Sequence, residues 1–188
     1  GGTRTLAPIY APVDSKIFRL AYVNRDYGDR GMRAEYSISF KASCEVTYTF
    51  DHISAVVDEI KSFAPMDSSS RNDVEVSIPV TAGQLVGYTD GTFTAGGFDF
   101  MVLNTAHTES YINPSRWQYD HSKYGVCPYD YFVSELKEEY YSLLKKTRLG
   151  DEKASCRALS RDVAGTLAGG WFQGDSTDKS GTRLVIAT

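Results

Sequence analysis

Histidine is scarce in this chain of 188 residues, with only three copies. They stand at His52, His107 and His121, and no two of them are two or four residues apart. A catalytic zinc ion needs three protein ligands, so the absence of a local histidine pair removes the usual core of such a site. The sequence also has no Gly-x-Ser-x-Gly nucleophile turn, and the glycine-rich residues 165–170 lack the Lys-Ser/Thr of a phosphate-binding loop.

Cysteine is equally rare and is widely spaced. Cys44, Cys127 and Cys156 form no Cys-x-x-Cys pair, which excludes a zinc knuckle. Cys127 and Cys156 flank a predicted helix and can form a disulfide in an oxidising compartment, and reduced, buried thiols fit the sequence equally well. Cys44 is expected to be buried in a strand. A nucleophilic pair of Cys127 with His121 is conceivable, but the residues after Cys127 offer no electropositive setting that would activate a thiol.

Two further absences limit the partners. The formal net charge is −4, so the chain lacks the concentrated basic surface of a nucleic-acid-binding protein. No apolar run approaches the roughly 20 residues of a transmembrane helix, and we expect no transmembrane segment. Aromatic residues are abundant by contrast, with 13 tyrosines and 9 phenylalanines. Tyrosine is frequent in strands and on binding faces, and the strand interpretation is favoured.

Most of the first half alternates apolar and polar residues, as β-strands do. The runs at 36–40 and 44–50 alternate strictly and are expected to pair as an antiparallel hairpin. The polar, glycine-containing residues 24–34 are expected to form a loop before them. Pro8 and Pro79 lie in predicted strands and restrict those strands to sheet edges, because proline cannot donate a ladder hydrogen bond.

Helical periodicity appears in two segments. Residues 54–64 carry an apolar stripe at helical spacing, with Ser54 as a plausible N-cap. Residues 128–147 have the clearest helical pattern in the chain, with lysines toward the C-terminal turn. A final strand is predicted at 182–187, and its expected pairing partner lies beyond Thr188.

Three motifs occur in an order and spacing that resemble lysostaphin-type zinc endopeptidases. The first is Ile-Tyr-Ala-Pro-Val-Asp at 9–14, and the second is Phe-Asp-His-Ile-Ser at 50–54. The third is the run 80–102, in which a Gly-Gln-Leu-Val-Gly turn at 83–87 leads to a strand. The resemblance covers roughly half of the chain. It implies a mainly β fold, an antiparallel barrel or sandwich of the duplicated hybrid motif type over about residues 9–102.

The metal ligands of that family are missing from the matching positions. The strand that carries two histidines in the family reads Phe-Asp-Phe-Met-Val at 98–102, with Asp99 as its one carboxylate, and no histidine precedes Ile9. Asp14 matches a turn aspartate whose role in the family is structural. His52 matches a cleft histidine that assists catalysis there, and it is the one family site residue that this sequence keeps. The resemblance therefore implies the fold without its zinc chemistry, and no metal or cofactor is expected.

Two groups of residues are candidates for binding. His52 and Asp99 are expected on the face of the former active-site cleft, where Asp99 is otherwise a satisfied polar residue. Trp171 and Phe172 are candidates for an aromatic ligand platform outside the barrel, although core packing is the favoured interpretation of these rings. A rearranged zinc site built from His52, Asp99 and His107 is the metal-dependent alternative.

These observations predict a peptidase-like β-barrel domain at residues 1–103 with a short inserted helix. A helical and loop extension at residues 104–188 is expected to pack its main helix on the barrel. We expect a non-catalytic binding or scaffold domain, a pseudoenzyme whose former groove takes a glycan, peptide or protein ligand. The alternative is a metal-dependent peptidase or cell-wall hydrolase with a rearranged or incomplete zinc site. Both interpretations imply an extracytoplasmic protein that is periplasmic, surface-anchored or secreted and associated with the cell envelope.

Overall fold

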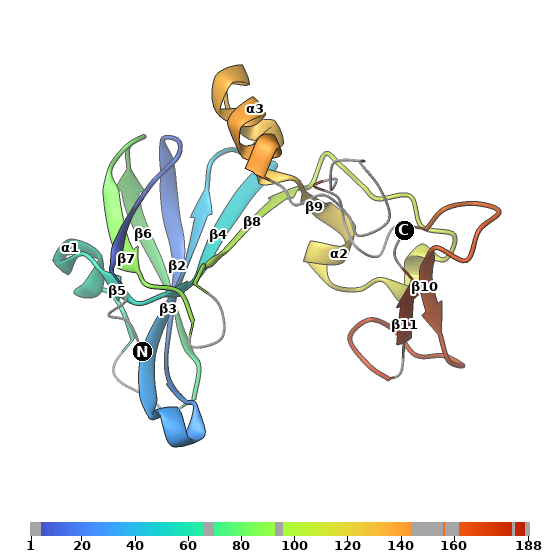
Figure 1. The fold of residues 1–188 in the computed structure, drawn as a ribbon, viewed down its shortest axis with the longest axis horizontal. Coiled ribbons are helices and arrows are strands. Elements are labelled where there is room, and N and C mark those ends of the chain that lie inside the picture. Colours follow the sequence, from blue (N-terminus) through green and yellow to red (C-terminus); the bar gives the residue numbers. More distant parts are fainter. Residues whose placement is uncertain are drawn as a thin grey trace. The chain divides into compact units, whose positions relative to one another are not determined.

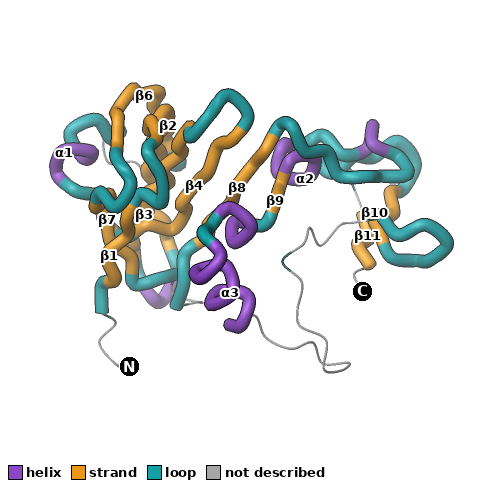
Figure 2. The backbone as a smooth tube through the Cα atoms, turned by 90° about the horizontal axis from the view of Figure 1, so that it is seen from above, coloured by secondary structure: helices purple, strands orange, loops and turns teal. Residues whose placement is uncertain are grey.

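The computed structural model describes residues 5–65, 70–92, 96–143, 156, 162–181 and 183–186. The chain forms two units, Gly1–Phe100 and Met101–Thr188, which are described separately. The described chain is mainly β, and its sheets are antiparallel (Figure 1). Figure 2 shows that strands make up most of unit 1, whereas loops and short helices make up most of unit 2. Within the described ranges, no helix combines the length and the apolar content that a membrane span requires.

Unit 1 contains two antiparallel sheets. The larger sheet has the order β6-β2-β3-β4-β8, and the smaller has the order β1-β7-β5. The strands are β1 (Ala7–Tyr10), β2 (Ser15–Asp26), β3 (Met32–Lys41), β4 (Val46–Ile53), β5 (Ala55–Val56), β6 (Asn72–Val80), β7 (Leu85–Thr89) and β8 (Asp99–Asn104). A 3₁₀ turn, η1 (Gly28–Arg30), joins β2 to β3, and helix α1 (Asp58–Lys61) follows β5. β8 begins in unit 1 and ends in unit 2.

One face of the larger sheet is apolar because its apolar residues lie opposite one another on neighbouring strands. Ile17 and Leu20 of β2 pair with Phe40 and Ile38 of β3, and all four side chains are fully buried. Phe40 also stacks on Tyr48 of β4, with ring centroids 4.4 Å apart. Full burial of such a side chain stabilises a fold by about 1.5–3 kcal/mol. This layer is therefore the main source of stability in unit 1.

The turn between β6 and β7 is tied to the start of the chain. Gly83 adopts a left-handed φ of 78°, and its N–H donates to the carbonyl of Ala11 at 2.8 Å. The Oδ1 atom of Asp14 accepts the N–H of Ala82 at 2.7 Å. Asp14 thus stabilises a turn, as predicted, but the turn that it stabilises is 68 residues away.

The predicted positions of the two strand prolines are confirmed. Pro8 lies in β1 and Pro79 in β6, and in the described sheets each of these strands has a neighbour on one side only. An edge position accommodates proline because no ladder hydrogen bond is required from its nitrogen. As β1, β5 and β6 are sheet edges, neither described sheet closes on itself.

The β2–β3 hairpin is longer than predicted. The sequence indicates a loop over residues 24–34, but β2 continues to Asp26 and β3 begins at Met32. The charged residues in this region extend the ladder, which satisfies their backbone groups. Gly28 and Gly31, with φ of 64° and 86°, confine the turn to a few residues.

The prediction that Cys44 is buried in a strand is wrong. Cys44 is an exposed free cysteine in the turn before β4, which begins at Val46. The Oγ atom of Ser43 accepts the N–H groups of Glu45 and Val46 at 3.2 and 3.0 Å. This side-chain turn competes with the strand ladder and delays the start of β4.

Helix α1 is shorter than the predicted helix over residues 54–64. Ser54 is not its N-cap, because the next two residues form β5 and pair with β7, and Val57 precedes the helix instead. The hydroxyl of Ser54 donates to Asp90 Oδ1 at 2.5 Å. Tertiary pairing therefore overrides the local capping pattern.

Unit 2 consists of short elements joined by loops. Its helical segments are η2 (Pro114–Arg116), α2 (Asp120–Tyr124), η3 (Pro128–Tyr131) and α3 (Ser134–Leu143), and its strands are β9 (Gly125–Val126), β10 (Gly169–Phe172) and β11 (Arg183–Ile186). β9 pairs with the end of β8, and β10 pairs with β11. The predicted strand at 182–187 therefore has its partner within the chain, and the expectation of a partner beyond Thr188 is wrong.

The main helix also begins later than predicted. The sequence indicates a helix over residues 128–147, but η3 occupies the first part and α3 begins at Ser134. The last part of the prediction, residues 144–147, lies outside the described residues. α3 buries none of its described side chains, and its contacts with η3 include Tyr140 stacked on Tyr129 at 5.0 Å.

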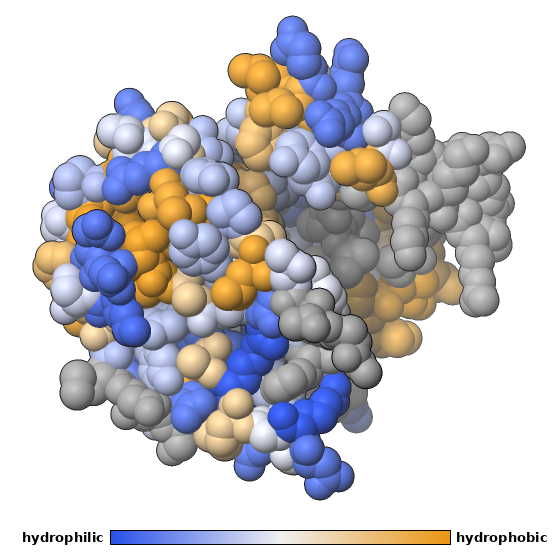
Figure 3. Space-filling model, turned by 60° about the vertical axis from the view of Figure 1, so that its left-hand side comes forward, coloured by the Kyte–Doolittle hydropathy of each residue, from blue (hydrophilic) through white to orange (hydrophobic). Residues whose placement is uncertain are grey.

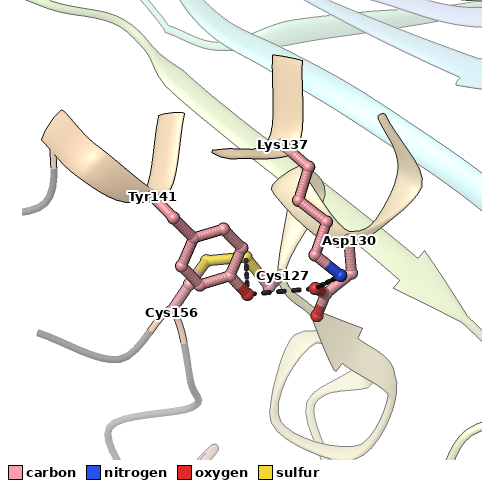
Figure 4. The surroundings of a disulfide bond; sticks show 5 residues. All are labelled: Cys127, Asp130, Lys137, Tyr141 and Cys156. Carbon is pink, nitrogen blue, oxygen red and sulfur yellow. Dashed lines mark hydrogen bonds and ion pairs between the residues drawn. A yellow bond between two sulfur atoms is a disulfide. The ribbon is translucent and has the colours of Figure 1, made fainter. Parts of the chain in front are cut away.

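A disulfide joins Cys127 to Cys156, with the two sulfur atoms 2.00 Å apart. Figure 4 shows the hydroxyl of Tyr141 between the disulfide and a carboxylate, 3.5 Å from Cys127 Sγ and donating to Asp130 Oδ1 at 3.0 Å. Lys137 Nζ lies 2.6 Å from the same carboxylate oxygen, and its hydrogen bond holds the pKa of Asp130 below the ordinary value. The disulfide therefore anchors a group that links η3 to α3.

Candidate functional site

The first candidate is His52, close to the end of β4. Its φ of 63° makes it the one described non-glycine residue in the left-handed region. Such a conformation costs about 1–3 kcal/mol and persists only where the surroundings hold it. Here Asp51 Oδ1 accepts the N–H of His52 at 2.9 Å, and the Thr89 hydroxyl donates to the His52 carbonyl at 3.0 Å. Strain of this kind is concentrated at functional sites, which marks His52 for attention.

Glu35 of β3 orients the imidazole ring. Its Oε2 atom lies 3.0 Å from His52 Nδ1 and accepts Arg25 Nε at 3.1 Å. Its other oxygen, Oε1, accepts the hydroxyl of Tyr27. The Glu35 side chain is only 3% exposed, so a charged carboxylate at this position depends on these partners.

The pKa values of this group follow from its burial and its hydrogen bonds. Burial by itself raises the pKa of Glu35, but hydrogen bonds from Tyr27 and His52, together with the charges of His52 and Arg25, hold the pKa below its ordinary value. Burial and the hydrogen bond to Glu35 raise the pKa of the Tyr27 hydroxyl. Glu35 is therefore an anion at neutral pH and only accepts hydrogen bonds, so the proton of the neutral imidazole is placed on Nδ1.

Asp99, at the start of β8, lies near the second nitrogen of the same ring. Its Oδ2 atom is 3.6 Å from His52 Nε2, and the two side chains are 76% and 23% exposed respectively. This distance is too long for a hydrogen bond and suits an ion pair when the imidazole is protonated. The structure thus brings together the two residues of unit 1 that the sequence selected as binding candidates.

A second polar group holds the chain at Ser54, two residues after His52. Arg33 donates to Asp90 and to the carbonyl of Gly91, and its guanidinium also donates to Ser54 Oγ at 2.8 Å. Burial raises the pKa of Asp90, but the hydrogen bonds from Ser54 and Arg33 outweigh burial and lower it. This network limits movement of the backbone that holds the His52 ring.

The described residues around His52 supply fewer donors than a catalytic zinc ion needs. Zinc requires three protein ligands and an open position. His52 Nε2 and Asp99 Oδ2 supply two donors, and among the described residues no group of three His, Cys, Asp or Glu side chains converges on one point. His107, the third member of the predicted alternative, instead lies 3.3 Å from Glu109 in unit 2.

The nucleophilic pair of Cys127 and His121, which the sequence disfavoured, does not form. Cys127 is bonded to Cys156, so it has no thiol to activate. His121 lies in helix α2, where its ring stacks on Tyr119 with centroids 4.9 Å apart.

The second candidate site is a pocket of about 260 Å³ within unit 2. Trp171 lines it and is 50% exposed, so the favoured interpretation of this ring as core is wrong. Phe172 does pack inward, edge-on to the buried Trp117 at 5.1 Å. Asn113 and Arg116 contribute polar groups to the lining. Of the two predicted aromatic candidates, only Trp171 presents a broad exposed surface.

A larger pocket of about 640 Å³ lies beside the disulfide. Its lining includes His107, Glu109 and Asp130. These groups already have partners, because His107 contacts Glu109 and Asp130 is paired with Lys137. Its chemistry is therefore that of satisfied surface polar groups.

Compared with protein-family models, with curated proteins and with solved structures, this chain has no match. Its function must therefore be argued from the geometry of its own residues.

Sequence reasoning missed the residues that hold both candidate sites in place. Glu35 stands in a strand whose alternation assigns Tyr36, Ile38 and Phe40 to the inner face, yet Glu35 itself is buried on the other side. The small serines that follow it on that side were the available signal that this face is also covered. Asp162, which supports the Trp171 pocket, carries no such signal, because its partners are backbone N–H groups, one of them 50 residues away in the sequence.

Proposed function

We propose that this chain is a non-catalytic binding domain and that unit 1 takes its ligand at His52 and Asp99. The observation that carries the proposal is the strained, partly exposed His52 ring, fixed through Nδ1 by the buried Glu35. A ring held in this way keeps its Nε2 edge in one direction before any ligand arrives, which reduces the entropic cost of binding. The exposed carboxylate of Asp99 beside Nε2 adds a second polar group.

The proposal extends to the architecture. Two antiparallel sheets with buried apolar faces support a peptidase-like sandwich of the duplicated hybrid motif type in unit 1. The hydrogen bonds of Ala82 to Asp14 and of Gly83 to Ala11 join two of the three motifs that resemble lysostaphin-type peptidases. A pseudoenzyme on this scaffold retains the histidine of the cleft and has lost the metal ligands.

The ligand that we propose is a glycopeptide of the cell envelope, met outside the cytoplasm. The His52 and Asp99 side chains offer a hydrogen-bonding nitrogen and an exposed anionic oxygen, which suit amide and amino groups of a peptide stem. The disulfide in unit 2 supports an oxidising compartment, where such bonds persist.

A metal-dependent hydrolase is the second candidate. It is favoured by one feature, the contact between Glu35 and His52 Nδ1, since metal-bound histidines commonly donate their other nitrogen to a carboxylate. Under this alternative the remaining ligands come from outside the described residues.

The test combines binding with metal analysis. Purified full chain is titrated with soluble peptidoglycan fragments while the ring ¹H–¹⁵N signals of His52 are followed by NMR, and co-sedimentation with intact peptidoglycan is measured in parallel. We expect the His52 signals to shift, and His52→Asn and Asp99→Asn to weaken binding at least tenfold. Asparagine tolerates a positive φ, so His52→Asn removes the ring without changing the backbone preference.

His121→Asn is the matched control and is expected to leave binding unchanged, because His121 belongs to unit 2. If the His52 ring signals do not shift and the protein does not co-sediment with peptidoglycan, the cell-envelope ligand is ruled out. If the purified protein contains stoichiometric zinc and His52→Asn loses it, the pseudoenzyme proposal is wrong and the hydrolase alternative is supported.

A further inference from the structure

The pocket beside Trp171 is large enough to bind a single ring of a small ligand. Its volume of about 260 Å³ is just below the range of roughly 300–1,000 Å³ that is typical of drug-sized ligands. The lining comes from η2, β10 and the loop that precedes β10, all of them in unit 2. It therefore forms without any contribution from unit 1.

The Trp171 indole is held in place although half of it is exposed. Its Nε1–H donates to the carbonyl of Leu167 at 2.9 Å, which fixes the ring relative to the loop before β10. Ala168 and Thr166 tighten that loop, since the N–H of Ala168 donates to the Thr166 hydroxyl at 3.0 Å. A large exposed ring with a fixed orientation presents a preorganised apolar surface, and little conformational entropy is lost when a ligand stacks on it.

The pocket walls are equally constrained. The carboxylate of Asp162 accepts the N–H of Ile112 at 2.8 Å and the N–H of Gly170 at 3.0 Å, so it joins two segments of the lining. Gly170 must be glycine, because a Cβ atom there would overlap the ring of Trp117. These contacts bring β10 against a buried aromatic ring and leave the pocket open beside it.

The charges in the lining are compensated within unit 2. The guanidinium of Arg116 donates to the carbonyl of Ser176 at 2.9 Å and pairs with Asp175 at 3.3 Å. Both oxygens of Asp162 are committed to backbone N–H groups. The lining therefore has no concentrated charge for a phosphate or a carboxylate. The buried Trp117 ring already has a cationic neighbour, because the guanidinium of Arg183 lies 5.7 Å from its centre.

The other polar side chains of the lining are uncharged, and each already has a local partner: the Thr166 hydroxyl donates to the Val163 carbonyl at 2.9 Å, and Asn113 Oδ1 accepts the Ser115 hydroxyl at 2.8 Å. Asn113 and Thr166 lie in the lining together with the indole of Trp171. A ligand that matches this combination has an apolar face to stack on the indole and hydroxyl or amide groups around its edge. A neutral pyranose ring has this chemistry, and a wholly apolar ring does not satisfy the polar lining.

We propose that unit 2 binds a neutral glycan, with one sugar ring stacked on Trp171. This site is separate from the His52 site and does not rest on the function proposed for unit 1.

Intrinsic fluorescence tests the proposal directly. The chain has two tryptophans, of which Trp117 is 2% exposed and Trp171 is 50% exposed, so a ligand that covers Trp171 shifts the emission to shorter wavelength. The labelled full chain is first applied to an array of neutral and acidic oligosaccharides. The chain is then titrated with soluble oligomers of N-acetylglucosamine and of glucose. We expect binding to neutral oligosaccharides and a blue shift that saturates with one of the two series.

Four variants separate stacking from effects on the fold and from the His52 site. Trp171→Ala is expected to weaken binding at least tenfold, whereas Trp171→Phe keeps an aromatic face and loses less. Leu184→Ala is the matched control, because Leu184 lies opposite Trp171 in the β10–β11 pairing, is 59% exposed and is not part of the lining. It is expected to bind as the parent chain does. His52→Asn is likewise expected to leave this binding unchanged, which distinguishes the two sites.

Three results would overturn the proposal. The first is an array without any neutral glycan bound, together with unchanged emission in both titrations. The second is glycan binding that survives Trp171→Ala. The third is a shift of Trp171 emission by a proline-rich or aromatic peptide but by no sugar, which would make the pocket a peptide site.

Discussion

Unit 1 and unit 2 are stabilised by different kinds of interaction. In unit 1, large apolar side chains such as Ile17, Leu20 and Phe40 are fully buried between paired strands. In the described part of unit 2, the buried apolar residues are Val102, Trp117, Cys127 and Ala168. The strands of unit 2 are short, so few side chains lie opposite one another across a sheet.

Unit 2 uses carboxylates that accept backbone N–H groups in place of an extended apolar layer. Asp162 joins Ile112 to Gly170, and Asp178 accepts the N–H groups of Gln118 and Tyr119. Burial raises the pKa of Asp178, but the hydrogen bonds from Gln118, Ser122 and Tyr119, together with the charge of Arg183, outweigh burial and lower it. A unit with few buried apolar groups thus achieves a defined structure through individual hydrogen bonds to carboxylates and a disulfide. The conditions that break these interactions differ from those that disrupt an apolar core.

The comparison is easy to follow experimentally, because both tryptophans lie in unit 2. Tryptophan emission therefore reports the unfolding of unit 2. The far-UV circular dichroism signal of β-strands reports mainly unit 1, which contains most of the described strands.

The largest effect is expected from Phe40→Ala. Phe40 is fully buried, stacks on Tyr48 and meets Phe50 edge-on at 5.3 Å, so its loss leaves a cavity in the main layer of unit 1. We expect a loss of about 4 kcal/mol in the free energy of unfolding of unit 1. Urea titration followed by circular dichroism checks the loss, and the tryptophan transition is expected to stay in place.

Phe63→Ala is the control for Phe40→Ala, because Phe63 is 53% exposed and its removal is expected to cost little. Equal movement of the dichroism and tryptophan transitions in Phe40→Ala would contradict the comparison, since it would mean that the two units unfold as one.

Removal of the disulfide by Cys127→Ser is expected to have the next largest effect, and only on unit 2. The bond joins residues 29 apart in sequence, and opening a loop of this length costs about 3 kcal/mol of stability. Thermal unfolding followed by tryptophan emission measures the loss, and added reductant should reproduce it in the parent chain. Cys44→Ser leaves the bond intact and should unfold as the parent does. A parent chain that is insensitive to reductant would show that the disulfide contributes nothing to unit 2.

Glu35→Gln is expected to destabilise unit 1 by about 2 kcal/mol at neutral pH, because three partners lose a charged acceptor in a buried position. The folded-state pKa of Glu35 is lowered, so its stabilising effect is present above the ordinary value of 4.5 and is lost as pH falls through the folded-state pKa. The difference between the variant and the parent should therefore shrink as the pH is lowered below 4.5.

Urea titrations at several pH values measure the effect of Glu35→Gln. Glu75→Gln, at an exposed position on β6, serves as the control and should show neither the loss nor its pH dependence. A constant difference between Glu35→Gln and the parent at all pH values would rule out the ionised carboxylate as the source of the stability.

The smallest effect on stability is expected from Trp171→Ala, about 1.5 kcal/mol. Half of the ring is exposed, so its truncation removes much less buried apolar area than the loss of a core aromatic ring does. Denaturant unfolding followed by the emission of Trp117 measures it. A loss comparable with that of Phe40→Ala would show that Trp171 belongs to a core and would blur the contrast between the two units.

The strands of unit 1 were largely predictable from the sequence, but the residues at which they begin and end were not. Alternation located β3, β4 and β6, and the prolines correctly marked two edge strands. The extended hairpin around η1 was missed because polar residues in a two-stranded ladder have no apolar pattern. Ser54 was misread as a helix cap because its actual partners, Arg33 and Asp90, are distant in the sequence.

The candidate sites were predictable only in part. His52 and Asp99 were chosen from motif positions, and the structure places them 3.6 Å apart. Glu35, which orients the ring, was missed because alternation assigns it to the outer face. The exposure of Trp171 was also missed, since it depends on Gly170 and Asp162 rather than on the indole itself. Sequence alone cannot indicate which of two adjacent aromatic residues faces outward in so short a strand.

The pairing of the first strands of unit 1 with its later ones also determines how the chain can fold during synthesis. β2, β3 and β4 form successive hairpins, which close quickly because their contacts are local. β1 pairs with β7, and Asp14 binds Ala82, so the N-terminal strand waits until more than seventy further residues have been made. Until then β1 is an unpaired edge, and the free side of β2 is one as well until β6 has been made. Such edges promote misassociation between nascent chains. A ribosome that pauses before β7 would thus lengthen the most aggregation-prone stage in the life of this protein.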